Sequence, residues 1–183
     1  MSAPSPVLSP PAQIAPAEIY LDYAATAPLH PRAAQAILSG HRLVGNPSSR
    51  HSAGRDAADA LSDARQTVAR LFGADAEEVV QPAGGSEANT LALWGTFAAV
   101  GFQGHLVTSS IEHPAVLANA HALQDLGVEV TFVDPAPTGH VDAAQVARAL
   151  RRETRLISVM HANNETGAIQ PVGDIAEIAA RSG

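Results

Sequence analysis

Three polar segments of the sequence each follow a predicted strand and carry side chains that could do chemistry. The first segment, Gly84-Gly85-Ser86-Glu87-Ala88-Asn89, leads into a predicted helix. Its glycines allow a ligand to approach the backbone, and the free N–H groups at a helix start favour an anion such as phosphate. The alternative is an ordinary tight turn in which Ser86 caps the helix. The segment has neither the Gly-Lys-Ser/Thr of a Walker loop nor the spacing of a dinucleotide fingerprint.

The other two segments supply an imidazole and a pair of amides. In residues 109–114, His113 could stack on a ring or move a proton near neutral pH, although a lone histidine can also be structural. Residues 161–171 contain Asn163 and Asn164, and the alternative here is a plain surface loop. Because parallel strands end at one sheet edge, the three segments are expected to meet there. A phosphate cradle, a histidine and two amides suit a flat phosphorylated aromatic cofactor such as pyridoxal phosphate.

Composition excludes several other kinds of site. The 183 residues include no cysteine, and all eleven basic residues are arginine, so this chain can form neither a disulfide nor a lysine Schiff base. No two of the eight histidines have the helical spacing of a metal site. A net charge of −7 without a basic run argues against nucleic acid and anionic membranes as partners. With no apolar stretch near the roughly 20 residues of a membrane span and no secretory signal pattern, a soluble cytoplasmic protein is expected.

Strand and helix patterns alternate along most of the chain. Residues 1–18 are rich in proline and predict a disordered leader. Strands are expected at 78–81, 105–108, 128–133 and 156–160, and helices at 31–39, 54–72, 86–98, 114–126, 142–152 and from 173 or 174. This order predicts an α/β fold with a mainly parallel sheet flanked by helices. The last helix reaches Gly183 without a following strand, which suggests a fragment or a domain that needs a partner segment.

Four stretches closely resemble the cysteine desulfurases, which are class V aminotransferase-like, fold-type I pyridoxal-phosphate enzymes. They are Leu21-Asp22-Tyr23-Ala24-Ala25-Thr26-Ala27-Pro28, Gly45-Asn46-Pro47-Ser48-Ser49-Arg50-His51 with Gly54, Glu112-His113, and Met160-His161-Ala162-Asn163-Asn164-Glu165-Thr166-Gly167. The resemblance runs in order from Ile19 to the end of the chain. It implies that residues 19–183 form the first part of a fold-type I transferase large domain.

The resemblance implies a role for individual residues. The N–H of Gly85 and the hydroxyl of Ser86 would hold the cofactor phosphate, and His113 would stack on the pyridine ring and take part in proton transfer. Asn164 would bind the phenolic oxygen, while Ala25 and Thr26 would line the substrate side. In this chain glycine and serine stand where the family usually has alanine and threonine, and Pro82-Ala83 replaces a usual Thr-Ser.

For a complete family member, the resemblance implies transfer of sulfur from L-cysteine to an enzyme thiolate, with release of L-alanine. The persulfide would then serve iron–sulfur cluster assembly or thiolation through a sulfur acceptor or scaffold protein, and the enzyme would be a homodimer. The family's Schiff-base lysine and persulfide-forming cysteine lie further on, so this chain alone is expected to be inactive. The alternatives are a related class V enzyme, such as a selenocysteine lyase or an aminotransferase, and a non-catalytic half-domain.

Overall fold

The computed structural model describes residues 19–182, so the predicted leader at 1–18 lies outside the described residues. The elements in chain order are α1 (Pro31–Gly40), α2 (Ser52–Phe72), the short 3₁₀ helix η1 (Ala76–Glu78), α3 (Gly85–Ala98), β1 (His105–Ser109), α4 (Pro114–Asp125), β2 (Glu129–Val133), α5 (Ala143–Ala149), β3 (Thr154–Ser158) and α6 (Val172–Ser182). We call residues 19–72 the N-terminal arm and residues 85–182 the sheet region.

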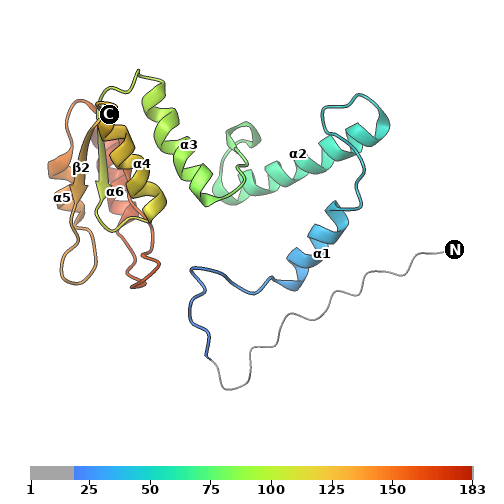
Figure 1. Cartoon of the computed structure of the whole chain (residues 1–183), viewed down its shortest axis with the longest axis horizontal. Helices are drawn as coiled ribbons and strands as arrows, with labels where there is room; N and C mark the ends of the chain where they lie inside the picture. Colours follow the sequence, from blue (N-terminus) through green and yellow to red (C-terminus); the bar gives the residue numbers. More distant parts are fainter. Residues whose placement is uncertain (1–18, 183) are drawn as a thin grey trace.

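The sheet region is built on three parallel strands in the order β2-β1-β3 (Figure 1). Central strand β1 is buried along its whole length, because it pairs with a neighbour on each side and lies between helices on both faces. The predicted α/β fold with a mainly parallel sheet flanked by helices is therefore confirmed.

Side chains of β1 alternate between two apolar clusters, as the period of two in a strand requires. Leu106 packs with Leu93 and Phe97 of α3 and with Leu123 of α4. On the opposite face, Val107 packs in a second cluster, with Val146 of α5 and Ile175 of α6 among its members. The two layers of helices bury both faces of the short sheet and fix the ends of its strands.

A buried polar brace crosses all three strands at the start of β1. The His105 ring is 1% exposed, with Nδ1 2.9 Å from Thr154 Oγ1 on β3 and Nε2 2.8 Å from Thr131 Oγ1 on β2. Both ring nitrogens therefore have partners, as a buried imidazole requires. Burial and the nearby Arg151 lower the pKa of His105, against the opposing effect of Glu129 and Glu153.

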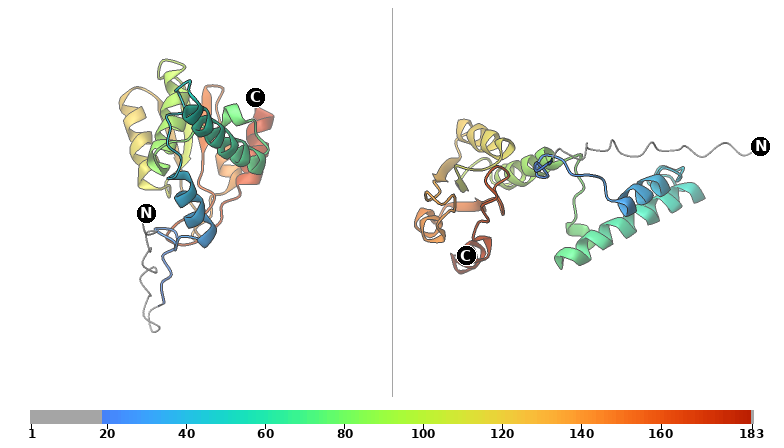
Figure 2. Two further views of the ribbon diagram at one scale, coloured as in Figure 1. Left: turned by 90° about the vertical axis from the view of Figure 1, so that its right-hand side faces the viewer. Right: turned by 90° about the horizontal axis from the view of Figure 1, so that it is seen from below.

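Helices α1 and α2 of the N-terminal arm extend away from the sheet region, as Figures 1 and 2 show. None of the residues of α1 is buried, and in α2 only Gly54 and Ala69 are. At the start of α2, His51 caps the helix by accepting a hydrogen bond from the Gly54 N–H. A Cβ on Gly54 would lie 2.3 Å from the Ser49 carbonyl oxygen, so only glycine fits where this loop meets the helix.

Two expectations about elements need correction. The predicted strand at 78–81 is wrong, because Ala76–Glu78 form the 3₁₀ helix η1 and residues 79–84 are irregular. A strand needs a neighbour to satisfy its backbone groups, and no described strand pairs with this β-branched stretch, whose Val80 is 71% exposed. The helix expected at 142–152 ends at Ala149, because Leu150 is extended and Arg151 forms a turn with Thr154. None of the helices within residues 19–182 is long and apolar enough to cross a membrane.

Candidate functional site

His113 lies in the turn between β1 and α4, where it caps the helix. Its Nδ1 accepts a hydrogen bond of 3.0 Å from the Ala115 N–H, and Pro114 opens the helix at a position that needs no N–H partner. The side chain is exposed. Because Nδ1 is occupied as an acceptor, a neutral His113 carries its proton on Nε2, which faces away from the cap.

Asn164 lies in the loop that follows β3, and its neighbour Asn163 organises that loop. The Asn163 Oδ1 accepts hydrogen bonds from the backbone N–H of Glu165 at 3.0 Å and of Thr166 at 2.9 Å. An isolated bridge between Ala162 and Ile169 closes the base of the loop. The amide of Asn164 is thereby left exposed at the tip.

One cavity of about 760 Å³ brings these two side chains together. Its lining residues come from three separate segments and are Ile19, Tyr20, Leu21, Asp22, Ala24, Ala25, His113, Asn164 and Glu165. The structure therefore places Ala25 of the predicted substrate side next to the predicted ring-stacking and amide residues. Thr26, Gly85 and Ser86 are not among the residues that line this cavity.

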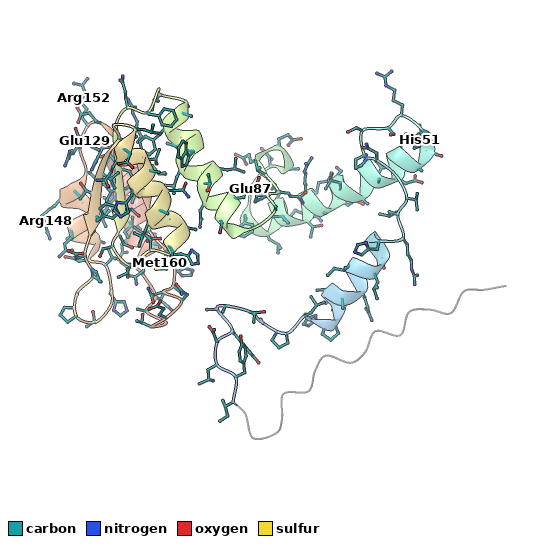
Figure 3. The ribbon with its side chains drawn as sticks, in the orientation of Figure 1. His51, Glu87, Glu129, Arg148, Arg152 and Met160 are labelled. Atoms are coloured by element: carbon teal, nitrogen blue, oxygen red, sulfur yellow. The ribbon has the colours of Figure 1, made fainter. Side chains whose placement is uncertain are left out.

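The predicted phosphate residues lie at the start of α3. Asn119 joins α3 to α4, donating to Thr90 Oγ1 at 3.0 Å and accepting from the Trp94 Nε1 at 2.6 Å. The two helices run side by side, with their first turns at the same end of the sheet region (Figure 3).

Ser86 is exposed, and the Glu87 carboxylate accepts a hydrogen bond of 2.6 Å from the Ala83 N–H. A Cβ on Gly85 would meet nothing within 4 Å, so the described chain does not by itself require glycine there. The roles of Gly85 and Ser86 stay predictions.

Glu112 is a buried residue next to this site, and the sequence predicted no role for it. It is 6% exposed, and its Oε1 accepts hydrogen bonds from the Ser109 hydroxyl at 2.6 Å and the Met160 N–H at 2.8 Å. Burial raises the pKa of the Glu112 carboxyl, and the two hydrogen bonds oppose that rise. The only feature of the sequence that pointed to a role for Glu112 was its position next to His113. Within residues 19–182 no three metal-binding side chains cluster, so the described part of the chain offers no candidate metal site.

The sequence of this chain was compared with models of known protein families, and one of them matches nearly the whole chain. The family described as "Aminotransferase class-V" matches residues 19–183. The chain belongs to the class V aminotransferase family. The expected resemblance to class V aminotransferases is thus confirmed.

The relatives of this class V chain include many cysteine desulfurases. It is 42% identical to cysteine desulfurase IscS of Dictyoglomus turgidum over 164 residues, covering 88% of this chain and 42% of that protein. It is 45% identical to IscS of Anaeromyxobacter sp. (strain K) over 168 residues, covering 90% of this chain and 42% of the relative. The chain therefore spans less than half the length of these curated relatives.

Solved structures give the same result for the fold. A structure described as SspA in complex with cysteine has a TM-score of 0.80 and 38% identity, with 88% of this chain and 47% of that chain covered. DndA from Streptomyces lividans has a TM-score of 0.74 and 39% identity, with coverages of 87% and 45%. The first part of a fold-type I pyridoxal-phosphate transferase domain is therefore the fold of this chain.

Proposed function

We propose that this chain forms the N-terminal part of the active site of a pyridoxal-phosphate-dependent cysteine desulfurase. The whole enzyme takes sulfur from L-cysteine, releases L-alanine and passes the sulfur as a persulfide to iron–sulfur assembly or to thiolation. The observation that carries the proposal is the cavity shared by Ala25, His113 and Asn164. Membership of the class V aminotransferase family supports it, since the same three positions are those that the resemblance assigns to substrate and cofactor.

The donor set of the site suits pyridoxal phosphate. The first N–H groups of α3 have no partner within the helix, and with the Ser86 hydroxyl they form a donor set for a phosphate. His113 and Asn164 supply a ring face and an amide for the aromatic part. When bound, the cofactor supplies the electron sink that makes the α-proton of an amino acid acidic.

His113 is the proton-handling group of this proposal. The Ala115 N–H holds Nδ1, so the ring keeps one orientation and only Nε2 is available to take up or release a proton. A group held this way can act as a general base and then as a general acid without losing its place. Its exposed ring also leaves a face free for stacking on an aromatic ligand.

Asn164 and the segment around Ala25 position the ligand. The Asn164 amide can donate a hydrogen bond to an oxygen anion, and Asn163 keeps the loop beneath it closed. Ala24 and Ala25 line the cavity with small side chains that leave room for an amino acid. Thr26 follows directly, and we assign it with Ala25 to the substrate side.

We further propose that this 183-residue chain alone does not turn over cysteine. It contains no lysine amine that could anchor the cofactor covalently and no cysteine thiolate that could accept sulfur. The whole protein is proposed to be a cytoplasmic homodimer that hands sulfur to an acceptor or scaffold protein. Exposed apolar side chains of the arm, such as Leu71 at 78% and Phe72 at 81%, support burial of this surface in a larger assembly.

The test is binding of pyridoxal phosphate to the purified chain, measured by equilibrium dialysis beside phosphate-free pyridoxal. We expect pyridoxal phosphate to bind more tightly, and His113→Ala to weaken binding by about tenfold through lost stacking. His121→Ala is the matched control, since His121 is exposed on α4 and does not line the cavity. Sulfide release from cysteine should stay at the protein-free rate. Equal binding of both compounds, or equal effects of the two histidine variants, would contradict the proposed site.

A further inference from the structure

Two side chains tie the turn after β1 to the loop after β3. The Glu112 Oε1, in the β1–α4 turn, accepts a hydrogen bond of 2.8 Å from the N–H of Met160, which follows the end of β3. In the reverse direction, the Asn163 Nδ2 donates to the Ile111 carbonyl at 3.2 Å. These links join segments about 50 residues apart in sequence. Figure 3 shows Met160 at the end of the sheet region where the proposed site lies.

Each of these two side chains directly precedes a residue that faces the cavity. Glu112 is 6% exposed, whereas the next residue, His113, is exposed and lines the cavity. Asn163 is half-buried, and the next residue, Asn164, is likewise exposed and lines the cavity. The buried side chain of Glu112 therefore fixes the backbone that carries His113. In the same way, the half-buried side chain of Asn163 fixes the backbone that carries Asn164.

We propose that Glu112 and Asn163 are positioning residues that hold His113 and Asn164 against one ligand. The proposal rests on the proposed function for the identity of that ligand. Burying a carboxylate is costly unless hydrogen bonds satisfy it, and the two that Glu112 accepts join β1 to the segment after β3. Asn163 uses both ends of its amide, with Oδ1 ordering its own loop and Nδ2 reaching the other loop.

The first measurement is amide hydrogen exchange of the full chain by NMR, which needs no ligand. Glu112→Ala should speed exchange of the Met160 N–H by about tenfold, because the hydrogen bond to Oε1 is lost. Glu112→Gln keeps an oxygen acceptor and should restore most of the protection. Asn163→Ala should speed exchange at Glu165 and Thr166 and supplies a second variant if Glu112→Ala does not fold.

Ser110→Ala is the matched control in the same turn. The Ser110 hydroxyl donates to Asp134 Oδ1 at 2.6 Å, which links the turn to the segment after β2 and not to the loop after β3. Its loss should leave the exchange of Met160 unchanged. Exchange of the Val107 N–H in the central strand should be the same in all variants, which separates a local effect from global unfolding.

The second measurement is pyridoxal phosphate binding with a double-mutant cycle. If Glu112 acts through His113, Glu112→Ala should weaken binding and the Glu112→Ala/His113→Ala double variant should bind like His113→Ala alone. Additive losses, unchanged Met160 exchange in Glu112→Ala, or an equal effect of Ser110→Ala would overturn the positioning role. No binding by the unsubstituted chain would instead overturn the proposed function, and the Met160 exchange would still decide whether Glu112 holds the two loops together.

Discussion

The sheet region and the N-terminal arm both contain helices, but these helices are stabilised differently. Among the residues that the structure describes, Ala69 is the only buried hydrophobic residue of the arm, whereas the others lie in the sheet region. Helix α3 buries Leu93 and Phe97 against the sheet, while α2 ends in the exposed side chains Leu71 and Phe72. The arm therefore depends on local helix formation and capping, and the sheet region on packing.

The largest difference is expected between two phenylalanines. Phe97→Ala empties a fully buried position in the core and should lower the free energy of unfolding by about 3–5 kcal/mol. Phe72→Ala removes the same side chain at 81% exposure and should change it by no more than about 0.5 kcal/mol. Urea denaturation followed by circular dichroism measures both. Similar losses would show that the arm is packed in solution and would contradict the difference between the arm and the sheet region.

The side chain of Asn119 on α4 links this helix to α3, so its removal measures how much the link stabilises the sheet region. Its amide bonds to Thr90, Trp94 and the Ala115 carbonyl, so Asn119→Ala leaves the half-buried Trp94 N–H unpaired. We expect a loss of about 1–3 kcal/mol in the free energy of unfolding, with a change in Trp94 fluorescence. Gln124→Ala, at an exposed position of the same helix, should have almost no effect.

The buried His105 should make the stability of the sheet region depend on pH. Its pKa in the folded chain lies below the ordinary 6.5, so unfolding takes up a proton at pH values between the two. The contribution of His105 to the free energy of unfolding is therefore complete above pH 6.5 and falls as the pH is lowered through this interval. Glu112, with a raised pKa, acts in the opposite direction. Its contribution to the free energy of unfolding is complete below pH 4.5 and is lost as the pH rises from there through the raised pKa. Denaturation at several pH values should show a smaller slope for His105→Asn; an unchanged slope would refute the assignment.

Two glycine substitutions should change stability in opposite directions. Gly73 ends α2 with a φ of +64°, a left-handed conformation in which alanine costs about 1 kcal/mol. Gly95 lies within α3, where a Cβ meets nothing within 4 Å, so Gly95→Ala should stabilise the helix by about 0.5–1 kcal/mol. Gly73→Ala should reduce helical circular dichroism without moving the transition of the sheet region. A shift of that transition would show that the arm and the sheet region unfold together.

The sequence predicted best those elements whose pattern is local. The apolar run at 156–160 and the helical spacing at 54–72 gave β3 and α2 to within a few residues. The stretch 78–81 had the β-branched composition of a strand, but pairing depends on a neighbour that local sequence does not reveal.

In the candidate site, too, the sequence revealed some of the residues and not others. His113 and Asn164 could be named because reactive side chains after strands are visible in the sequence, and the structure places both in one cavity. Glu112 had no predicted role, and Asn163 was expected to face the cofactor as one of two amides but does not line the cavity. The hydrogen bonds of these two side chains to Met160 and Ile111 join distant segments, so the sequence did not reveal them. Burial of a polar side chain by a distant segment has no local signature.

The brace at His105 also bears on how the sheet assembles. The ring meets Thr131, 26 residues away, and Thr154, 49 residues away, so both contacts exist only when all three strands have come together. A chain that has paired only two strands leaves one buried ring nitrogen without a partner, which is unfavourable. Two-strand intermediates are thereby penalised, and the brace makes formation of the sheet a more cooperative event, at the cost of long loop closures that slow folding.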